Sequence, residues 1–478
     1  MPRPGRAIFG WLGVCVGQDP ARCALGGRVV GAGQTFAAAL LLLSAQAVAD
    51  VTVYPGQVVP DGVVVVPGDT VTVAADGLLG NGPNLSGIFV ALQPNGPSSD
   101  PVNLRISGVV QGRDRAIYVP WGIRFLLTGA DGGVFDGIIH GPPDVGATAL
   151  RLDMTDVTHR VELGANGRIQ GAYGISAHYI TEPGIGGYWG GRIHNGRLEV
   201  VNAGVIRGAP QAIQVTCRPC GPQSSVSIIN SGTIVADYLD QTPAGALFIS
   251  SGVDDVYLEN TGFIGADPAI YAAGGFNFTN LYDTVSVRGR SVTVSSSNSA
   301  VWLGDVEFSG STVLTGPDGK FAGSFTGHVN TGNLTQNLIF SGTIAPRRDA
   351  TDPGVLYGIG GLRVNAAKGH VFVNEGSISA YLDGQTPISF NVGNTLELAV
   401  GLNHYTIADG TGPALIENKS GSLIRGENGI ELFSFLAIPD RVARVVNAGT
   451  IQGMLGTGVY ADYLQSGPIN ELDRAVVS

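Results

Sequence analysis

Val226-Ser-Ile-Ile-Asn230-Ser-Gly232-Thr-Ile234 is the stretch that decides the fold, because the chain returns to the same phrase along most of its length. Each copy is a short apolar strand, an Asn and a Gly, and a second apolar strand. The other close copies begin at Leu198, Val256, Val371 and Val445. Asn202, Asn230 and Asn260 are separated by 28 and 30 residues. A fixed period of roughly 20 to 50 residues is typical of a solenoid, in which each unit buries its apolar face on the next.

The second recurring phrase predicts how the units are connected. It reads Ala116-Ile-Tyr-Val119, Gly174-Ile-Ser-Ala177 and Ala212-Ile-Gln-Val215, so each unit supplies at least two strands. Parallel neighbouring strands need a return path, and no amphipathic helix is predicted after about residue 50 to provide one. A chain that coils stacks each strand on its equivalent one turn earlier. The sequence therefore predicts an all-β parallel β-helix.

The Asn and Gly of each phrase are predicted to be structural turn residues and not ligands. Gly tolerates positive φ, and Asn tolerates the left-handed region while its amide bonds to neighbouring backbone. Asn side chains stacked in successive coils also form a hydrogen-bonded ladder. The residues with this expected role are Asn202, Gly204, Asn230, Gly232, Asn260, Gly262, Asn374, Gly376, Asn447 and Gly449.

Composition divides the chain into three segments. Residues 1–49 carry four Arg, a short apolar run and Ala47-Val48-Ala49 before Asp50, which is typical of an export signal with an extended leader. Residues 50–103 are predicted to form an N-terminal strand-rich cap with a loop, and residues 104–478 the β-helix. The apolar run is too short to span a bilayer, and nothing later predicts a transmembrane helix.

The net negative charge of the chain argues against polyanionic partners. Without its first 49 residues the chain has 23 Lys and Arg and 37 Asp and Glu, since four Arg and one Asp lie in the leader, and 23 − 37 gives −14. This acidity argues against a nucleic-acid partner and against an anionic membrane surface. No phosphate-binding loop or zinc motif is found, so we expect no cofactor and no metal.

Cys217-Arg-Pro-Cys220 holds the two cysteines that remain after the leader. We expect a small disulfide that pins a surface loop, because exported proteins permit disulfides. A redox role is the alternative, although no βαβ context surrounds the motif. A metal site is a further alternative, and it would need two more ligands.

The repeated Asn-x-Gly-x-Ile phrase, the second phrase and the long leader resemble the passenger domains of bacterial autotransporters over residues 50–478. The resemblance implies a right-handed β-helix that is displayed at the cell surface, associated with the outer membrane or secreted. Passengers of this family are often adhesins, autoaggregation factors or virulence proteins. Their C-terminal translocator barrel is not recognised here, where the sequence reads Arg474-Ala-Val-Val-Ser478, so further sequence would have to supply it. If the barrel is truly absent, we expect a periplasmic location.

Three functions follow from these observations. The first is a surface-exposed adhesin-like or autoaggregation scaffold without catalysis, whose partners are host molecules, neighbouring-cell molecules or a second copy. The second is a polysaccharide lyase or hydrolase on a β-helix, for which Asp305 and Glu307 are the candidate acid and base. Side chains two residues apart on a strand point to the same face. The third is a truncated autotransporter fragment without function.

Overall fold

The computed structural model describes most of the chain from residue 50 to residue 477. The expected leader, residues 1–49, lies outside the described residues, and so do these segments: 81–85, 92–97, 113–114, 121–122, 129–137, 141–147, 155, 180–194, 218–219, 238–244, 267–284, 347–360, 368, 381–389, 393–394, 398–401, 409–413, 435–442, 455–457, 464–475 and 478.

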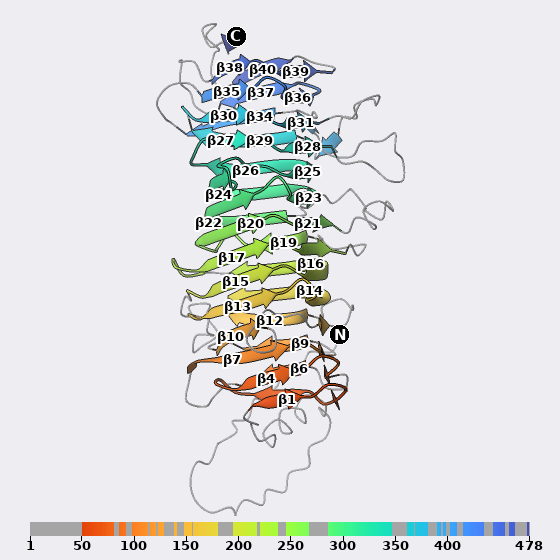
Figure 1. The fold of residues 1–478 in the computed structure, drawn as a ribbon. Helices are drawn as coiled ribbons and strands as arrows, with labels where there is room; N and C mark the ends of the chain where they lie inside the picture. Colours follow the sequence, from red (N-terminus) through yellow and green to blue (C-terminus); the bar gives the residue numbers. More distant parts are fainter. Residues whose placement is uncertain are drawn as a thin grey trace, which may run out of the picture. The chain divides into compact units, whose positions relative to one another are not determined.

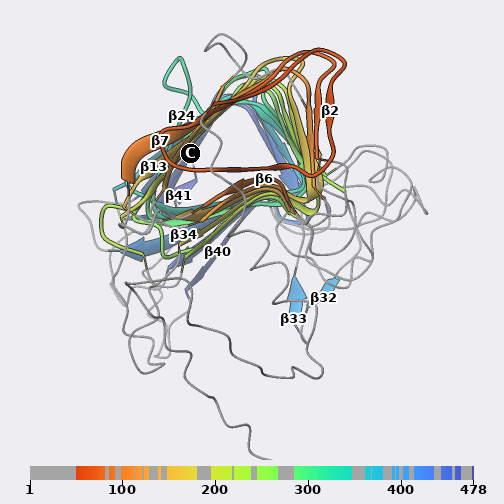
Figure 2. The ribbon, with the colours of Figure 1, turned by 90° about the horizontal axis from the view of Figure 1, so that it is seen from below.

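The described residues form a parallel β-helix (Figure 1), as the sequence predicts. Each turn of the coil passes through three strands, and each strand pairs in parallel with its equivalent in the coils before and after it. Seen along the coil, the strands superpose as the three sides of a triangle (Figure 2). We call these sides face 1, face 2 and face 3, in the order in which the chain passes through them.

The strands of face 1 carry the first half of the repeat. They are β1 (Val51–Val53), β4 (Thr70–Val73), β7 (Ser98–Ile106), β10 (Ile123–Thr128), β13 (Thr158–Leu163), β15 (Arg197–Asn202), β17 (Ser225–Asn230), β20 (Asp255–Asn260), β27 (Leu338–Phe340), β30 (Val371–Asn374), β35 (Ala414–Asn418), β38 (Ala443–Asn447) and β41 (Val476–Val477).

The strands of face 2 follow the Asn and Gly. They are β2 (Val58–Val59), β5 (Leu78–Leu79), β8 (Val109–Gln111), β11 (Ile138–His140), β18 (Thr233–Ala236), β21 (Phe263–Ala266), β23 (Val301–Leu303), β25 (Ser324–Thr326), β28 (Thr343–Ala345), β31 (Ser377–Ser379), β36 (Leu423–Gly426) and β39 (Thr450–Gly453).

The strands that lie wholly or mainly on face 3 include those of the second phrase. They are β3 (Val63–Val65), β6 (Ser86–Val90), β9 (Arg115–Val119), β12 (Thr148–Met154), β19 (Gly245–Ile249), β34 (Leu402–Ala408), β37 (Ile430–Ser434) and β40 (Val459–Tyr463).

Six longer strands turn a corner of the triangle without a break. β14 (Arg168–Tyr179) and β16 (Val205–Cys217) run from face 2 into face 3. The others, β22 (Val285–Ser296), β24 (Val306–Thr315), β26 (His328–Leu334) and β29 (Gly361–Ala367), run from face 3 into face 1. A separate hairpin pairs β32 (Phe390–Val392) with β33 (Thr395–Glu397) in antiparallel fashion.

Alternation of side chains along each strand builds the core. Inward positions are apolar and buried, and register pairing stacks them in columns along the coil. On face 2 the inward column is Val110, Ile139, Ile169, Ile206, Ile234, Ile264, Trp302, Phe325, Ile344, Ile378 and Ile424. Each fully buried side chain of this size contributes roughly 1.5–3 kcal/mol relative to an exposed one.

The coil begins earlier than the sequence predicts. Val51 of β1 already pairs in parallel with Val71 of β4, and β4 pairs with β7. The described strands between residues 51 and 103 therefore pair into the coil and do not form a separate cap, so coiling begins before residue 104. These first coils lack the Asn-x-Gly-x-Ile phrase and advance by only 20 residues from Val51 to Val71. A search for the longer repeat therefore passes over them.

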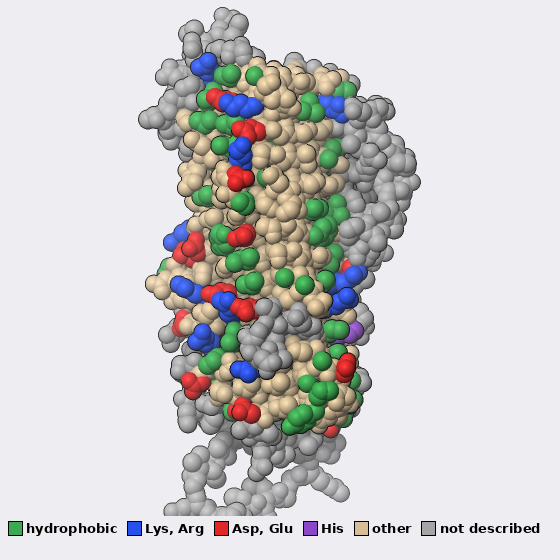
Figure 3. Space-filling model, in the orientation of Figure 1, with side chains coloured by type: hydrophobic (Ala, Val, Ile, Leu, Met, Phe, Trp, Pro, Cys, Tyr) green, Lys and Arg blue, Asp and Glu red, His purple; other side chains and the backbone are tan. Residues whose placement is uncertain are grey.

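Figure 3 shows the surface of the coil in the orientation of Figure 1. Positive and negative side chains alternate along its left edge, and a broad stripe of uncharged polar side chains and backbone lies beside them. Among the described residues, most ion pairs join neighbours within a coil or between adjacent coils, whereas Lys320 pairs with Glu375 two coils later. Arg160 pairs with Glu162 and with Glu199, at 3.1 Å for the latter pair. Among the described residues, no helix is long and apolar enough to cross a membrane.

Candidate functional site

The outward side chains of face 3 form one column that combines many chemical types. Backbone pairing places these residues at equivalent positions of successive strands: Phe89, Tyr118, Arg151, Ser176, Gln214, Phe248, Ser286, Glu307, Asn330, Arg363, Glu431 and Tyr460, with the backbone of Asn403 between the strands of Arg363 and Glu431. The outward column of face 2 is instead dominated by aliphatic residues and Thr, for example Val109, Ile138 and Thr343. Face 3 thus carries a column that mixes aromatic, charged and amide groups, although a second outward column of face 2 also holds polar residues, for example Gln111, His140 and Gln170.

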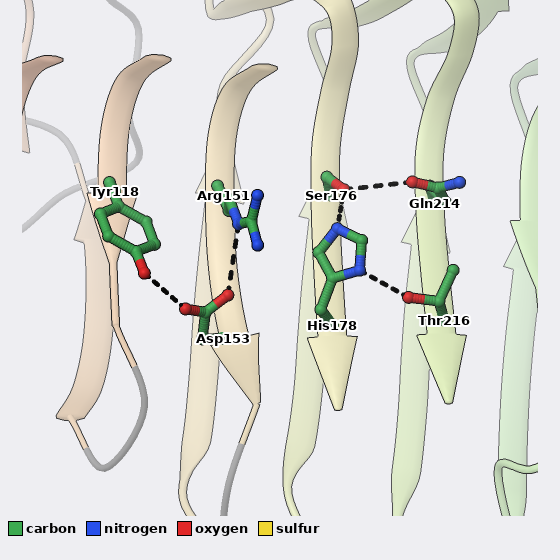
Figure 4. A network of polar contacts seen from close by, with 7 residues as sticks. All are labelled: Tyr118, Arg151, Asp153, Ser176, His178, Gln214 and Thr216. Atoms are coloured by element: carbon green, nitrogen blue, oxygen red, sulfur yellow. Dashed lines mark hydrogen bonds and ion pairs between the residues drawn. The ribbon is translucent and has the colours of Figure 1, made fainter. Parts of the chain in front are cut away.

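A first polar network occupies β9 and β12 (Figure 4). The hydroxyl of Tyr118 donates to Oδ2 of Asp153 at 2.7 Å, and Nε of Arg151 donates to Oδ1 at 3.3 Å. Asp153 is only 2% exposed, so these two donors offset much of the cost of burying its charge. Burial and the bond to Asp153 raise the pKa of Tyr118 to about 12. Tyr118 is therefore a fixed hydrogen-bond donor at neutral pH.

A second polar network lies on the next two strands, β14 and β16 (Figure 4). Nε2 of His178 lies 2.7 Å from the hydroxyl of Ser176, and Nδ1 lies 2.6 Å from the hydroxyl of Thr216. The Ser176 hydroxyl also lies 3.2 Å from Oε1 of Gln214. Burial is the main cause that lowers the pKa of His178, with Arg151 adding to it, so the ring is neutral at pH 7.

A serine beside a histidine is the arrangement of an activated nucleophile, but two features of this pair favour a structural role. Ser176 is only 2% exposed, which leaves no room for a substrate carbonyl. The second ring nitrogen of His178 is bonded to a hydroxyl and not to the carboxylate that orients the histidine of a catalytic triad. The network therefore holds the outer surface of β14 and β16 in place.

Asp305 and Glu307, the candidate acid and base, both make contacts that hold the coil together. Oδ1 of Asp305 accepts the backbone N–H of His328 at 2.8 Å. Glu307, two residues later on β24, forms an ion pair with Arg288 of β22 at 2.6 Å. Both carboxylates thus connect neighbouring strands of the coil.

The Asn residues of the repeat form two side-chain ladders at the corner between faces 1 and 2. Asn202 donates to Asn230 at 2.7 Å and Asn230 to Asn260 at 2.8 Å. Asn374 donates to Asn418 at 2.8 Å, and Asn418 to Asn447 at 2.8 Å.

Between the ladders, Ser296 occupies the register position that follows Asn260. Nε1 of Trp302 donates to the Ser296 hydroxyl at 3.0 Å, and this hydroxyl donates to the carbonyl of Ala322 at 2.5 Å. Nδ2 of Asn260 is buried and has no hydrogen-bond partner within the described part of the chain. Ser296 thus takes the place of an Asn and bonds to the indole of Trp302, and the first ladder ends there.

The expected reason for the glycines is wrong, although their structural role is clear. None of the repeat glycines, nor their Asn partners, has a positive φ. A Cβ on Gly232 would instead lie 2.2 Å from the carbonyl oxygen of Gly204 in the preceding coil, and Gly262 stands in the same relation to Gly232. Glycine is required because successive backbones approach closely.

Cys217 and Cys220 are joined in a disulfide, with Cα atoms 5.5 Å apart. Cys217 ends β16 and is buried beside Gly252, where a Cβ would lie 2.7 Å from the Cys217 sulfur. Within the described ranges, no group of three or more His, Cys, Asp or Glu could hold a metal ion. The disulfide links the end of β16 to Cys220.

Sequence reasoning missed the networks around Tyr118 and His178. Both lie in or next to copies of the second phrase, Ala116–Val119 and Gly174–Ala177, which predicted strands but no partners. Aligning these copies in register would have placed Tyr118 and Ser176 in one outward column. The contacts within the two networks could not be predicted in this way, because they join residues that are up to 38 positions apart in the sequence.

Comparison with known proteins adds no identity: no family, no curated protein and no solved structure matches this chain. The class that the fold defines is a parallel β-helix whose face 3 carries a mixed polar and aromatic column.

Proposed function

We propose that this chain is an exported, surface-exposed β-helical scaffold of the adhesin type, which binds other molecules without catalysing a reaction. The observation that carries the proposal is the outward column of face 3, which stays in register from Phe89 to Tyr460. Strands in successive coils lie about 4.8 Å apart, so the column offers a regular series of aromatic, charged and amide groups. Extended flanks of this kind are the binding surfaces of solenoid proteins.

Polysaccharide cleavage is the alternative, and no specific contact favours it. The predicted pair, Asp305 and Glu307, is engaged by the His328 backbone and by Arg288. Ser176, which lies beside His178, is buried. The contacts of these three residues join neighbouring strands and so stabilise the coil.

Surface display tests the proposal directly. The full chain, fused to an outer-membrane anchor, is displayed on a non-adherent bacterial strain, and cells with the anchor alone serve as the control. We expect faster settling, or greater attachment to host-cell monolayers, than in the control at equal display. Mixing displaying with non-displaying cells separates self-association, which needs the protein on both cells, from binding to another surface molecule. Unchanged settling and attachment at high display would contradict the proposal.

Export needs its own experiment. We expect the natural host to process the chain before Asp50 and to place it outside the cytoplasm. Fractionation with N-terminal sequencing of the mature protein measures both. A protein found intact in the cytoplasm would contradict the export part of the proposal, and a periplasmic protein would contradict surface display alone. Absence of the protein would instead support the alternative of a fragment without function.

A further inference from the structure

One strand of face 1, β17, presents an uncharged outer surface between two charged strands. Its outward residues are Ser225, Ser227 and Ile229. Ile229 is 37% exposed, although it is a large apolar side chain. Removing such a side chain from water against a partner surface is favourable. The outer surface of β17 is therefore suited to contact with a partner.

The strands on either side of β17 carry opposite charges at the same register position. Arg197 of β15 pairs in register with Ser225, and Ser225 pairs with Asp255 of β20. Arg197 and Asp255 are both exposed. They lie one coil before and one coil after β17 in a single column, about 9.6 Å apart along the coil.

This arrangement of charges is complementary to itself. A second copy that faces β17 with its coil reversed is related to the first by a two-fold axis along β17, so each residue of β17 lies opposite the same residue of the other copy. Ile229 then packs on Ile229. Arg197 of each copy lies opposite Asp255 of the other, and the contact contains two intermolecular charge pairs.

Other symmetric arrangements of this face place like charges together. With the two coils parallel, the axis runs along the middle of the face, and the residues at the two ends of each strand exchange places. Asp255 then lies opposite Glu259, and Glu199 lies opposite itself. In the reversed arrangement, an axis over β15 or β20 would place Arg197 or Asp255 opposite itself. Like charges in contact disfavour an interface, so β17 is the position that suits the axis.

We infer that two copies of this chain associate through face 1, with antiparallel coils and β17 on the two-fold axis. A contact over the five coils from β13 to β22 measures about 24 Å along the coil and about 20 Å along the strands, on the order of 500 Å² on each copy. A contact of this size is weak by itself, whereas many copies between two cells act together. The inference goes beyond the column of face 3, and it rests on the proposed function only for its role between cells.

Cysteine cross-linking of the purified full chain tests the geometry. Ile229→Cys places a thiol on the two-fold axis, so mild oxidation should join two copies into a covalent dimer. Val301→Cys is the matched control, because Val301 is exposed to a similar degree, 40%, but lies on face 2. It should give no more dimer than the unchanged chain, which measures cross-linking through the four native cysteines.

Exchange of charge tests the intermolecular pairs. Arg197→Asp and Asp255→Arg should each weaken association at least about tenfold, because each places like charges opposite one another. An equimolar mixture of the two variants should associate as the original protein does, since each copy supplies the charge that the other lacks. Sedimentation velocity at up to about 0.1 mM protein measures the fraction of dimer.

Arg168→Asp is the matched control for charge, because Arg168 is an exposed arginine of β14 that lies on face 2. It should leave the dissociation constant within about twofold of the original. Circular dichroism and thermal melting check that each variant is folded, and recovery in the mixture shows directly that both charge variants are.

Two results would overturn the inference: no more covalent dimer for Ile229→Cys than for Val301→Cys, or no recovery of association when Arg197→Asp and Asp255→Arg are mixed. Either result, with displaying cells that still settle or attach, would leave the proposed function standing and make another surface molecule the partner. Cross-linking and recovery without any effect of display on settling or attachment would support the inference and contradict the proposed function.

Discussion

Nδ2 of Asn202 donates a 2.7 Å hydrogen bond to Oδ1 of Asn230, 28 residues later in the chain and one coil further along. The same nitrogen lies 3.2 Å from the carbonyl oxygen of Thr233. Oδ1 of Asn202 accepts the backbone N–H of Gly204 at 3.1 Å. One side chain therefore ties together its own turn and the next, and its repetition fixes the corner between faces 1 and 2.

Asn230→Ala should destabilise the coil by roughly 2–4 kcal/mol. It removes the bonds to Asn202 and Asn260 and leaves their buried amide groups with fewer partners, at about 1–3 kcal/mol for each unsatisfied group. The midpoint of urea unfolding measures the change. Asn447→Ala is the control, since Asn447 is exposed, and it should cost less than about 1 kcal/mol. Equal losses would show that the ladder is not what stabilises this corner.

Gly232→Ala should cost about 3 kcal/mol, because its Cβ would meet the Gly204 carbonyl oxygen at 2.2 Å and force the two coils apart. The comparison is Gly319→Ala, in a turn with φ of 72° and open space around the added methyl group. Backbone strain alone predicts about 1 kcal/mol there. Thermal melting of both variants distinguishes the effects, and a smaller loss for Gly232→Ala would refute the close-approach explanation.

His159 makes the stability of the protein depend on pH. It is fully buried in the inward column beside Phe125 and Leu198, and neither ring nitrogen has a hydrogen-bond partner within the described residues. Burial lowers its pKa from 6.5 to about 4. The unfolded chain therefore binds a proton between these values that the folded chain does not, and stability falls as pH drops below about 6.5.

At pH 5 the loss from His159 amounts to about 2 kcal/mol. His159→Leu should remove this part of the pH dependence and stabilise the protein at pH 5 more than at pH 7.5. Urea midpoints at the two pH values measure it. Val161→Ala, at the next inward position of β13, changes no titratable group and is the control, so it should lower stability by the same amount at both pH values. The same slope in His159→Leu as in the original protein would contradict the assignment.

Tyr118→Phe should destabilise the protein by about 1–3 kcal/mol, because the carboxylate of Asp153 is buried and loses its 2.7 Å donor. Tyr257→Phe removes a bond of similar length, 2.8 Å, to Glu259 at an exposed site. The exposed carboxylate is solvated by water, so this control should cost less than about 0.5 kcal/mol. The melting temperatures of the Tyr118→Phe and Tyr257→Phe variants are compared. Equal melting temperatures would mean that Asp153 accepts a hydrogen bond from another donor in Tyr118→Phe.

Much of the fold could be predicted because its signals are local. Alternation around Val226–Ile234 predicts strands, and the fixed period with no helix between the strands requires coiling. The Asn ladders follow from the recurrence of Asn at the same place in each phrase, although bonded Asn residues lie 28, 30, 44 and 29 positions apart. The first coils were not predicted because Val51–Val73 lacks the repeated phrase. The end of the first Asn ladder at Ser296 was not predicted because it involves a hydrogen bond between the side chains of Trp302 and Ser296.

The sequence by itself determined the class of fold, the inward columns and the corner residues, because a side chain on a strand alternates with a period of two and each coil repeats its neighbour. Only the tertiary structure decided which outward residues meet. Arg115, Tyr118, Arg151 and Asp153 come together because coils of different lengths are brought into register by backbone pairing. The loops between strands vary in length, so the register of face 3 cannot be counted along the chain. Contacts across that face arise only once the coils stack.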